Sequence, residues 1–184
     1  ERVVEDLARA MRLTKLSLAF SRVERVTRHE DGVRPETDTD HTVMLGLVAC
    51  ELAPTDLNRA KVAAFALVHD FVEVYAGDAQ TLTISAEGMA AKRDREDAAR
   101  ERLVAELGRG SWLAELLATY EEQREPEARF VRLLDKVLPK LTHAFNGCAA
   151  AVALTDQAGF ADAHARQYEK LRREYPEFPD ALRL

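Results

Sequence analysis

Long apolar runs, cysteine pairs and strand-forming patterns are all scarce in this chain of 184 residues. No apolar run reaches the roughly 18 residues that a helix needs to cross a bilayer, so we expect no membrane segment. The two cysteines, Cys50 and Cys148, form no Cys-x-x-Cys pair, which argues against a paired-thiolate site and predicts buried, reduced thiols. The N-terminus lacks a secretory signal pattern, so we expect a cytoplasmic protein.

Positive charge is in the minority. The chain has 26 Lys and Arg residues against 32 Asp and Glu residues, which gives a net charge of −6. This balance argues against a protein that binds the backbone of a nucleic acid polymer. A local basic cleft for a small phosphate compound is compatible with it. We therefore expect a small-molecule partner rather than a nucleic acid or a membrane.

The main pattern along the chain is apolar residues at helical spacing. Capping residues and helix breakers such as Asp56, Gly77, Ser111 and Pro126 divide this pattern, with Asp56 expected as the N-cap of the third helix. We expect helices at residues 5–20, 41–52, 56–76, 89–107, 111–122, 126–153 and 160–173. Since no repeat or linker interrupts the pattern, we expect a single all-α domain over residues 1–184.

A polar connection of about twenty residues, 21–40, separates the first two expected helices. It contains Gly32 and Pro35 and shows no strand pattern, so we expect it to be irregular. Connections of this length are uncommon inside a compact domain and are often functional.

A histidine–aspartate doublet, His69-Asp70, interrupts an apolar run near the middle of the chain. Buried ionisable groups without partners are costly, so they usually pair or hold a metal. His41 follows the polar connection, and Asp135 lies among apolar residues, with Lys136 expected to point about 100° away from it. Together, two imidazoles and two carboxylates would form a mixed site, from His41, His69, Asp70 and Asp135. Such a site suits one divalent ion of Mn, Fe, Co, Ni or Zn. The alternative is a set of ordinary core groups that pair within the protein.

Two further acids follow the doublet. Glu73 lies one helical turn after His69 and projects to the same side of an expected helix. It is either a solvated helix carboxylate or a general acid or base beside a metal. Asp78 follows the expected end of that helix, where an aspartate often serves only as a cap.

Three basic residues are candidates for phosphate contacts. Arg22 and Arg25 lie in the polar connection before His41 and are either surface charges or bidentate partners for substrate phosphate. Lys92 lies in the charged run 92–97, which is most simply a solvated helix face, with a phosphate contact as the alternative.

The order of these motifs resembles the HD-domain metal-dependent phosphohydrolase superfamily. More narrowly, it is similar to the branch that contains the bacterial 5′-deoxynucleotidases and the human HD-domain-containing protein 2. The resemblance is carried by residues 22–25, 34–41, 67–78 and 127–136. It implies a single helical bundle of about six to eight helices around a metal site. It also implies a homo-oligomer, most simply a dimer.

The resemblance also implies roles for individual residues. It implies that Glu73 is catalytic, that Asp78 lies in the active site, and that the metal ligands are His41, His69, Asp70 and Asp135. The chain departs from the family at Val26, where relatives commonly have an aromatic residue after the arginine, and in the loop at residues 28–33. Both departures concern substrate choice rather than the metal site.

The sequence therefore predicts a metal-dependent phosphohydrolase of nucleotides, in the first place a 5′-deoxynucleotidase that releases phosphate from nucleoside 5′-monophosphates. An alternative enzyme is a nucleoside triphosphate triphosphohydrolase or an alarmone pyrophosphohydrolase. An alternative of another class is a regulatory domain that binds nucleotides without turnover. For the oligomer, an Ala-rich stretch at residues 148–153 either packs against a partner subunit or belongs to the core.

Overall fold

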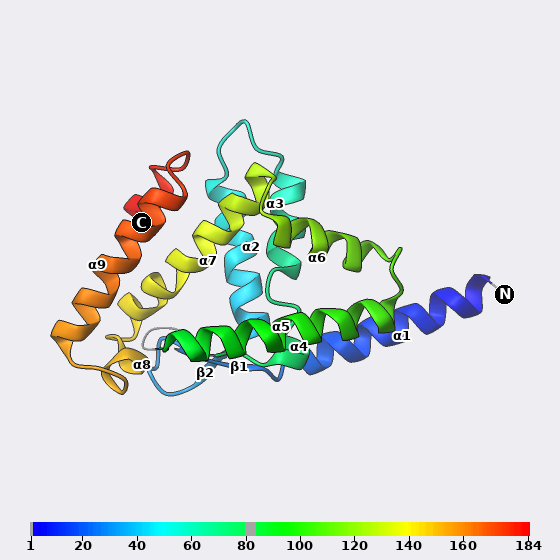
Figure 1. Cartoon of the computed structure of the whole chain (residues 1–184), viewed down its shortest axis with the longest axis horizontal. Helices are drawn as coiled ribbons and strands as arrows, with labels where there is room; N and C mark the ends of the chain where they lie inside the picture. Colours follow the sequence, from blue (N-terminus) through cyan, green and yellow to red (C-terminus); the bar gives the residue numbers. More distant parts are fainter. Residues whose placement is uncertain (1, 80–83) are drawn as a thin grey trace.

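α-Helices form nearly all of the secondary structure in this computed structural model, which describes residues 2–79 and 84–184 (Figure 1). Within these ranges, seven helices have ten or more residues: α1 (Arg2–Phe20), α2 (Asp38–Leu52), α3 (Arg59–Val68), α5 (Ala86–Leu107), α6 (Trp112–Glu122), α7 (Pro126–Phe145) and α9 (Gln157–Glu174). Shorter elements are α4 (Glu73–Ala76), α8 (Ala149–Val152) and a 3-10 turn (Ala181–Arg183). The expected all-α bundle of six to eight helices is confirmed.

Two apolar clusters hold these helices together. In the first, α3 packs against both α2 and α7, and Leu45, Phe65 and Leu134 from these three helices are at most 1% exposed. In the second, α5 packs against α4 and α6, and its Leu103 joins Leu16 from the end of α1. Burial of these side chains is the main favourable contribution to folding. The first cluster fixes the three helices that carry the four candidate ligands or lead into them.

Residues 21–40 contain a two-stranded antiparallel sheet, so the expectation of an irregular connection is wrong. β1 (Glu24–Arg28) pairs with β2 (Pro35–Thr37) and also contacts α7. The turn between the strands is closed by Asp31, whose carboxylate accepts hydrogen bonds from the backbone N–H groups of Val33 and Arg34. A strand of three residues is too short to show an alternating pattern, which is why the sequence carried no strand signal.

The helix expected at residues 56–76 is interrupted, and its expected N-cap is wrong. α3 begins after Asn58, whose side-chain oxygen accepts from two N–H groups of the first turn, rather than after Asp56. The chain then leaves the helix before α4, and the His69-Asp70 doublet lies in this intervening turn. The doublet is therefore not constrained to the faces of a continuous helix.

α2 begins three residues earlier than expected. Its N-cap is Thr37, which forms a reciprocal capping box with Asp40: each side chain accepts a hydrogen bond from the other residue's backbone N–H. His41 consequently lies within the first turn of α2, buried against the rest of the protein.

The helix expected at residues 126–153 also divides in two. Between α7 and α8, Gly147 and Cys148 adopt left-handed φ angles of 62° and 61°. Ala150 and Ala151 of α8 are buried, and α8 contacts β1 of the same chain. The Ala-rich stretch therefore packs within the protein. Both cysteines are free and half-buried, rather than fully buried as expected.

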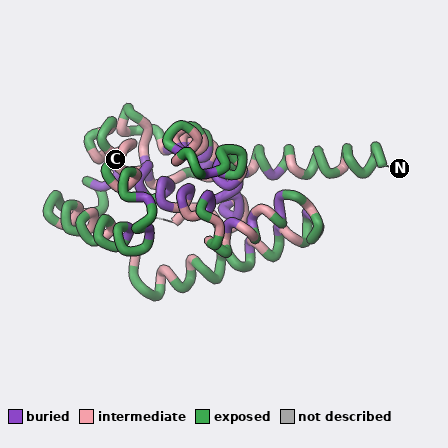
Figure 2. The backbone as a smooth tube through the Cα atoms, turned by 90° about the horizontal axis from the view of Figure 1, so that it is seen from above, coloured by how far each residue is buried: buried purple, intermediate pink, exposed green. Residues whose placement is uncertain are grey.

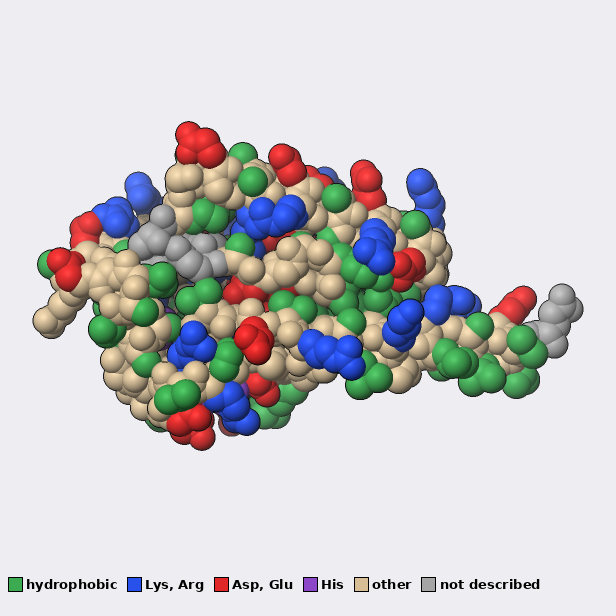
Figure 3. Space-filling model, turned by 90° about the horizontal axis from the view of Figure 1, so that it is seen from below, with side chains coloured by type: hydrophobic (Ala, Val, Ile, Leu, Met, Phe, Trp, Pro, Cys, Tyr) green, Lys and Arg blue, Asp and Glu red, His purple; other side chains and the backbone are tan. Residues whose placement is uncertain are grey.

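The first half of α1 projects from the body of the protein (Figures 1 and 2). Four apolar residues on it, Val3, Val4, Leu7 and Met11, are each at least 60% exposed. Figure 3 shows apolar side chains gathered on this arm. No helix in the described part of the chain is both long and apolar enough to cross a membrane.

The observed start of α3 can be tested by removing its cap. Asn58→Ala should lower the free energy of unfolding by about 1 kcal/mol, because two N–H groups of α3 lose their acceptor. The control Asp56→Ala removes an exposed side chain and should change that free energy by less than about 0.5 kcal/mol. Urea denaturation followed by circular dichroism measures both changes. Equal losses in the two variants would contradict the helix start seen here.

Candidate metal centre

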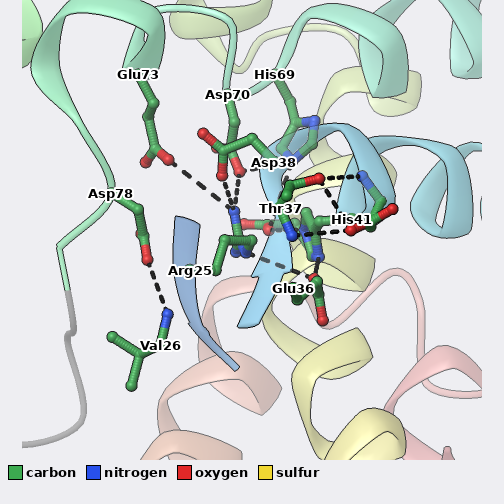
Figure 4. A network of polar contacts seen from close by, with 12 residues as sticks. Arg25, Val26, Glu36, Thr37, Asp38, His41, His69, Asp70, Glu73 and Asp78 are labelled. Atoms are coloured by element: carbon green, nitrogen blue, oxygen red, sulfur yellow. Dashed lines mark hydrogen bonds and ion pairs between the residues drawn. The ribbon is translucent and has the colours of Figure 1, made fainter. Parts of the chain in front are cut away.

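Four ligand-type side chains meet where α2, α3 and α7 pack together. His41 comes from α2, His69 and Asp70 from the turn after α3 (Figure 4), and Asp135 from the middle of α7. Each offers one nitrogen or oxygen atom, and these atoms all lie within 4.8 Å of one another. The structure therefore brings together all four residues that the sequence predicted as ligands.

Hydrogen bonds hold the outer nitrogen of each imidazole. Nδ1 of His69 lies 2.8 Å from the carbonyl oxygen of Ala66, which can only accept, so this nitrogen carries a proton. Nδ1 of His41 lies 3.0 Å from Oε1 of the buried Glu36. Metal-ligating histidines ordinarily pair their remote nitrogen with a carbonyl or a carboxylate in this way. Both rings therefore direct Nε2 toward the cluster.

The inner nitrogens face carboxylate oxygens. Nε2 of His41 lies 3.0 Å from Oδ1 of Asp135, and Nε2 of His69 lies 3.0 Å from Oδ2 of Asp70. His69 Nε2 is buried and makes no hydrogen bond within the described residues. A nitrogen lone pair that faces a carboxylate is repelled unless positive charge lies between them. The donor set of two nitrogens and two carboxylates thus fits a divalent metal ion.

The protonation of His41 controls the charge of this cluster. Burial opposes protonation, but hydrogen bonds with Asp135 and Glu36 outweigh it and raise the pKa of His41 to about 9. Burial also disfavours an ionised Asp135, yet Lys136 and His41 hold the pKa of its carboxyl well below the usual value. A proton on His41 therefore offsets the carboxylate, and a metal ion must displace that proton to bind.

Lys136 contacts Asp135, so the expectation that it points away is wrong. Its Nζ lies 2.7 Å from Oδ2 of Asp135, because the long side chain bends back although its Cα lies about 100° around the helix. Oδ1 of the same carboxylate faces both His41 and His69. Asp135 therefore keeps one oxygen available for a metal.

Arg25 reaches the cluster from β1 and lies among carboxylates (Figure 4). Its Nη1 lies 2.8 Å from Oδ2 of Asp70 and 3.0 Å from Oδ1 of Asp38, and its Nε lies 3.6 Å from Oε1 of Glu36. Burial alone would lower the pKa of this guanidinium, but the negative charges of Asp70 and Asp135 raise it above the usual value. Arg25 is therefore a fixed positive charge next to the candidate ligands.

Two of the three remaining predicted site residues, Arg22 and Asp78, lie farther out. Arg22 is exposed just after the end of α1, and no described contact joins it to the cluster. Asp78 is half-buried, and its Oδ2 accepts a hydrogen bond of 3.4 Å from the backbone N–H of Val26 (Figure 4). The structure brings Asp78, but not Arg22, to the edge of the site.

Glu73 is buried at the start of α4. Burial, together with the charges of Asp70 and Asp38, raises the pKa of Glu73 to about 10, so its carboxyl is neutral near pH 7. Nζ of Lys92 lies 3.4 Å from its Oε1, which makes Lys92 a neighbour of Glu73 rather than part of a solvated face. A neutral carboxyl beside a candidate metal site is able to donate a proton.

Sequence reasoning missed two buried acids, Glu36 and Asp38. Glu36 points inward from β2 and orients His41, but a strand of three residues shows no alternating pattern from which Glu36 could have been found. Asp38 pairs with Arg25, yet burial raises the pKa of Asp38 to about 6. Its carboxylate lies within 4.8 Å of those of Asp70 and Glu73, which extends the charged cluster beyond the four ligands.

A pocket of about 290 Å³ opens beside the cluster. Arg25, Val26, Asp78 and Asp135 line the part next to the candidate ligands, and α7, α8 and α9 form the remaining walls. Its size is at the lower end of the range for pockets that bind small ligands. A small molecule bound in this pocket therefore touches a candidate metal ligand and two candidate catalytic or binding residues.

About half of this chain is similar in sequence to named vertebrate proteins. The human (Homo sapiens) 5′-deoxynucleotidase HDDC2 is 34% identical over 106 residues, which cover 56% of this chain and 50% of the human protein. The zebrafish (Danio rerio) protein of the same name is 25% identical over 104 residues, which cover 56% and 52% of the two chains. The chain thus spans about half the length of the curated relatives that it matches.

The fold has a close counterpart among solved structures. A predicted metal-dependent phosphohydrolase from Magnetospirillum magnetotacticum MS-1 superimposes with a TM-score of 0.71 and 25% identity, over 96% of this chain and 93% of the other. Residues 20–178 match the family model of the HD domain. Because that match covers most of the sequence, this chain belongs to the HD domain family.

Proposed function

We propose that this chain is a metal-dependent phosphohydrolase that acts on nucleotides, specifically a 5′-deoxynucleotidase that releases phosphate from nucleoside 5′-monophosphates. The observation that carries the proposal is the convergence of two imidazole nitrogens and two carboxylates beside a pocket for a small ligand. The matched relatives named 5′-deoxynucleotidase support the choice of substrate class.

In this proposal His41, His69, Asp70 and Asp135 hold one divalent ion of the Mn, Co, Fe, Ni or Zn type. Two nitrogen donors favour these metals over Mg and Ca, which prefer oxygen donors throughout. When bound, such an ion supplies Lewis acidity toward a phosphoryl oxygen and lowers the pKa of water. The anchored Nδ1 atoms keep both rings in the orientation that binding requires.

Glu73 and Asp78 are assigned to proton transfer and water positioning. Glu73 keeps its proton near neutral pH and can donate it to the departing 5′-oxygen as the phosphorus–oxygen bond breaks. The N–H of Val26 fixes the Asp78 carboxylate at the edge of the pocket, where it can accept first a hydrogen bond and then a proton from the attacking water. Together they account for the acid and base that hydrolysis needs.

Arg25 is assigned to the phosphoryl group. Its Nη1 and Nε face carboxylates, whereas no carboxylate in the described part of the chain pairs with Nη2, and the residue lines the pocket. A guanidinium with a free edge is a natural partner for phosphate oxygens and stabilises charge that develops on them. The exposed position of Arg22 gives no support to the same role, so we assign phosphate binding to Arg25 alone.

We also propose that the chain forms a homo-oligomer, in the simplest case a dimer. The exposed apolar face on the projecting half of α1 supports this, whereas the Ala-rich stretch at residues 148–153 does not, since Ala150 and Ala151 are buried within the chain. The cytoplasmic location, the absence of a nucleic acid partner and the single-domain organisation of residues 1–184 stay predictions from the sequence.

The ligand set is testable by metal content. His69→Ala and Asp135→Ala should each lose the one equivalent of divalent metal expected in the wild type, because each removes one of four donors. The control Asp94→Ala removes an exposed carboxylate on α5 and should retain the metal. Elemental analysis of folded protein, checked by circular dichroism, gives the answer. Full occupancy in both ligand variants would refute the ligand set.

Metal binding should strengthen as the pH rises. Because the pKa of His41 is about 9 without metal, binding at lower pH displaces one proton from this ring. The apparent association constant should therefore increase about tenfold per pH unit between roughly pH 6.5 and 8. Competition with a chelating dye at several pH values measures this slope. An affinity that does not change with pH would show that metal binding displaces no proton from His41.

Glu73 should be needed for turnover but not for metal binding. Glu73→Gln keeps the shape of the side chain and removes its acidic proton, so kcat should fall by about 100-fold or more at unchanged metal content. The control Glu96→Gln changes another acid that contacts Lys92 and should retain most activity. Phosphate release from a nucleoside 5′-monophosphate measures both variants. A near wild-type kcat for Glu73→Gln would remove it from the proton transfer.

A further inference from the structure

The pocket has a basic region along the C-terminal half of α7. Lys140 and His143 extend from α7 one turn apart, and His164 lines the same pocket from α9, which runs beside α7 in Figure 1. Apolar side chains, including Pro139 and Leu154, line the pocket with them. Three basic groups from two helices are therefore collected in one small, partly apolar space.

These three basic groups have no acidic partner in the described part of the chain. Two other bases that line the pocket do: Lys136 pairs with Asp135, and Arg166 pairs with an acid on its own helix. No described carboxylate lies within 4.0 Å of Lys140, His143 or His164. The first two bases are neutralised within the protein, and the three others are available for a ligand.

Positive charge on these three groups is unfavourable without an anion. Burial lowers the pKa of each of the three groups, and the charges of Lys140 and His143 lower that of His164 further. Nδ1 of His143 is buried and makes no hydrogen bond to the residues described. Glu36 is the acid whose charge acts on His143, but its Oε1 is engaged by His41. An anion bound here would satisfy the unpaired donors.

We propose that Lys140, His143 and His164 bind a second phosphate group of the substrate. The proposal rests on the proposed function, which places the phosphate to be cleaved at the candidate metal centre next to Asp135. Lys140 and His143 follow Asp135 by five and eight residues, so their Cα atoms lie about 7 to 12 Å farther along the axis of α7. A nucleotide with phosphates at two separate positions spans such a distance.

The substrate class that fits best is a nucleoside 3′,5′-bisphosphate. This compound keeps the 5′-phosphate monoester that the proposed reaction cleaves, and its 3′-phosphate lies on the other side of the sugar. A nucleoside 5′-triphosphate offers the same anionic chemistry but places the extra phosphates on the chain that is attacked. The two sources of the second phosphate can be separated by kinetics.

The test compares deoxyadenosine 5′-monophosphate, 3′,5′-bisphosphate and 5′-triphosphate as substrates of the metal-loaded enzyme. The wild type should show a kcat/KM for the bisphosphate about tenfold or more above that for the monophosphate. Lys140→Ala should abolish most of this advantage and change the monophosphate value by less than about twofold. The control Lys170→Ala, an exposed lysine of α9 that pairs with Glu174, should leave the ratio unchanged.

Each outcome decides the proposal. A loss in Lys140→Ala that is confined to the bisphosphate supports it, and a loss confined to the triphosphate supports a second-phosphate site but places that phosphate on the 5′ chain. Equal losses on monophosphate and bisphosphate, or no preference in the wild type, overturn it.

A binding measurement separates this proposal from the proposed reaction. If no nucleotide is hydrolysed, calorimetric titration of the wild type and Lys140→Ala with the bisphosphate and the monophosphate still reports on the site. A selective loss of bisphosphate affinity supports the second-phosphate site even though the proposed reaction has failed. Equal affinities for both compounds in both proteins overturn it.

Discussion

Repulsion among four neighbouring carboxylates, those of the buried Asp38, Glu73 and Asp135 and of the half-buried Asp70, is the constraint on which the rest of the structure depends. Like charges this close in a medium of low dielectric do not all stay ionised unless cations or protons offset them. Arg25 offsets two of them directly, and Glu73 keeps a proton. The negative charge that is not fully offset lies on Asp70 and Asp135, which face Nε2 of the two histidines. A divalent ion would neutralise that charge and accept both lone pairs at once.

Two departures from regular helix place these groups. α3 ends at Val68, and the turn that follows it places both His69 and Asp70 in the same cluster, although His69 keeps right-handed helical φ and ψ angles of −52° and −39°. The hairpin contributes from the other side, because β1 carries Arg25 and β2 carries Glu36 into the buried space. Both the turn and the hairpin therefore supply groups of the site.

The helices and the convergence of the four candidate ligands could be predicted because their signals are local: apolar residues recur at helical spacing, and ionisable groups interrupt apolar runs. The missed features depend on contacts between distant segments. Glu36 and Asp38 look like polar residues of a loop and a helix start, and only packing of the hairpin against the helices buries them. For Lys136, helix geometry gives the position of the Cα but not the reach of the side chain, which is long and flexible enough to bend back to Asp135.

The lining of the pocket would distinguish the proposed nucleotide substrates chiefly by charge. Val26 borders the pocket at the position where members of the family commonly have an aromatic residue. Within the described residues, no Phe, Tyr or Trp lines the pocket. Stacking on such a ring, which distinguishes bases poorly but binds them well, is therefore not available from these walls. The lining instead carries basic groups at both ends, from Arg25 near the candidate ligands to Lys140 on α7. Charge–charge attraction acts over several ångströms and is indifferent to the base. For the proposed nucleotide substrates, we therefore expect a pocket of this composition to discriminate by the number and placement of phosphates rather than by the identity of the base.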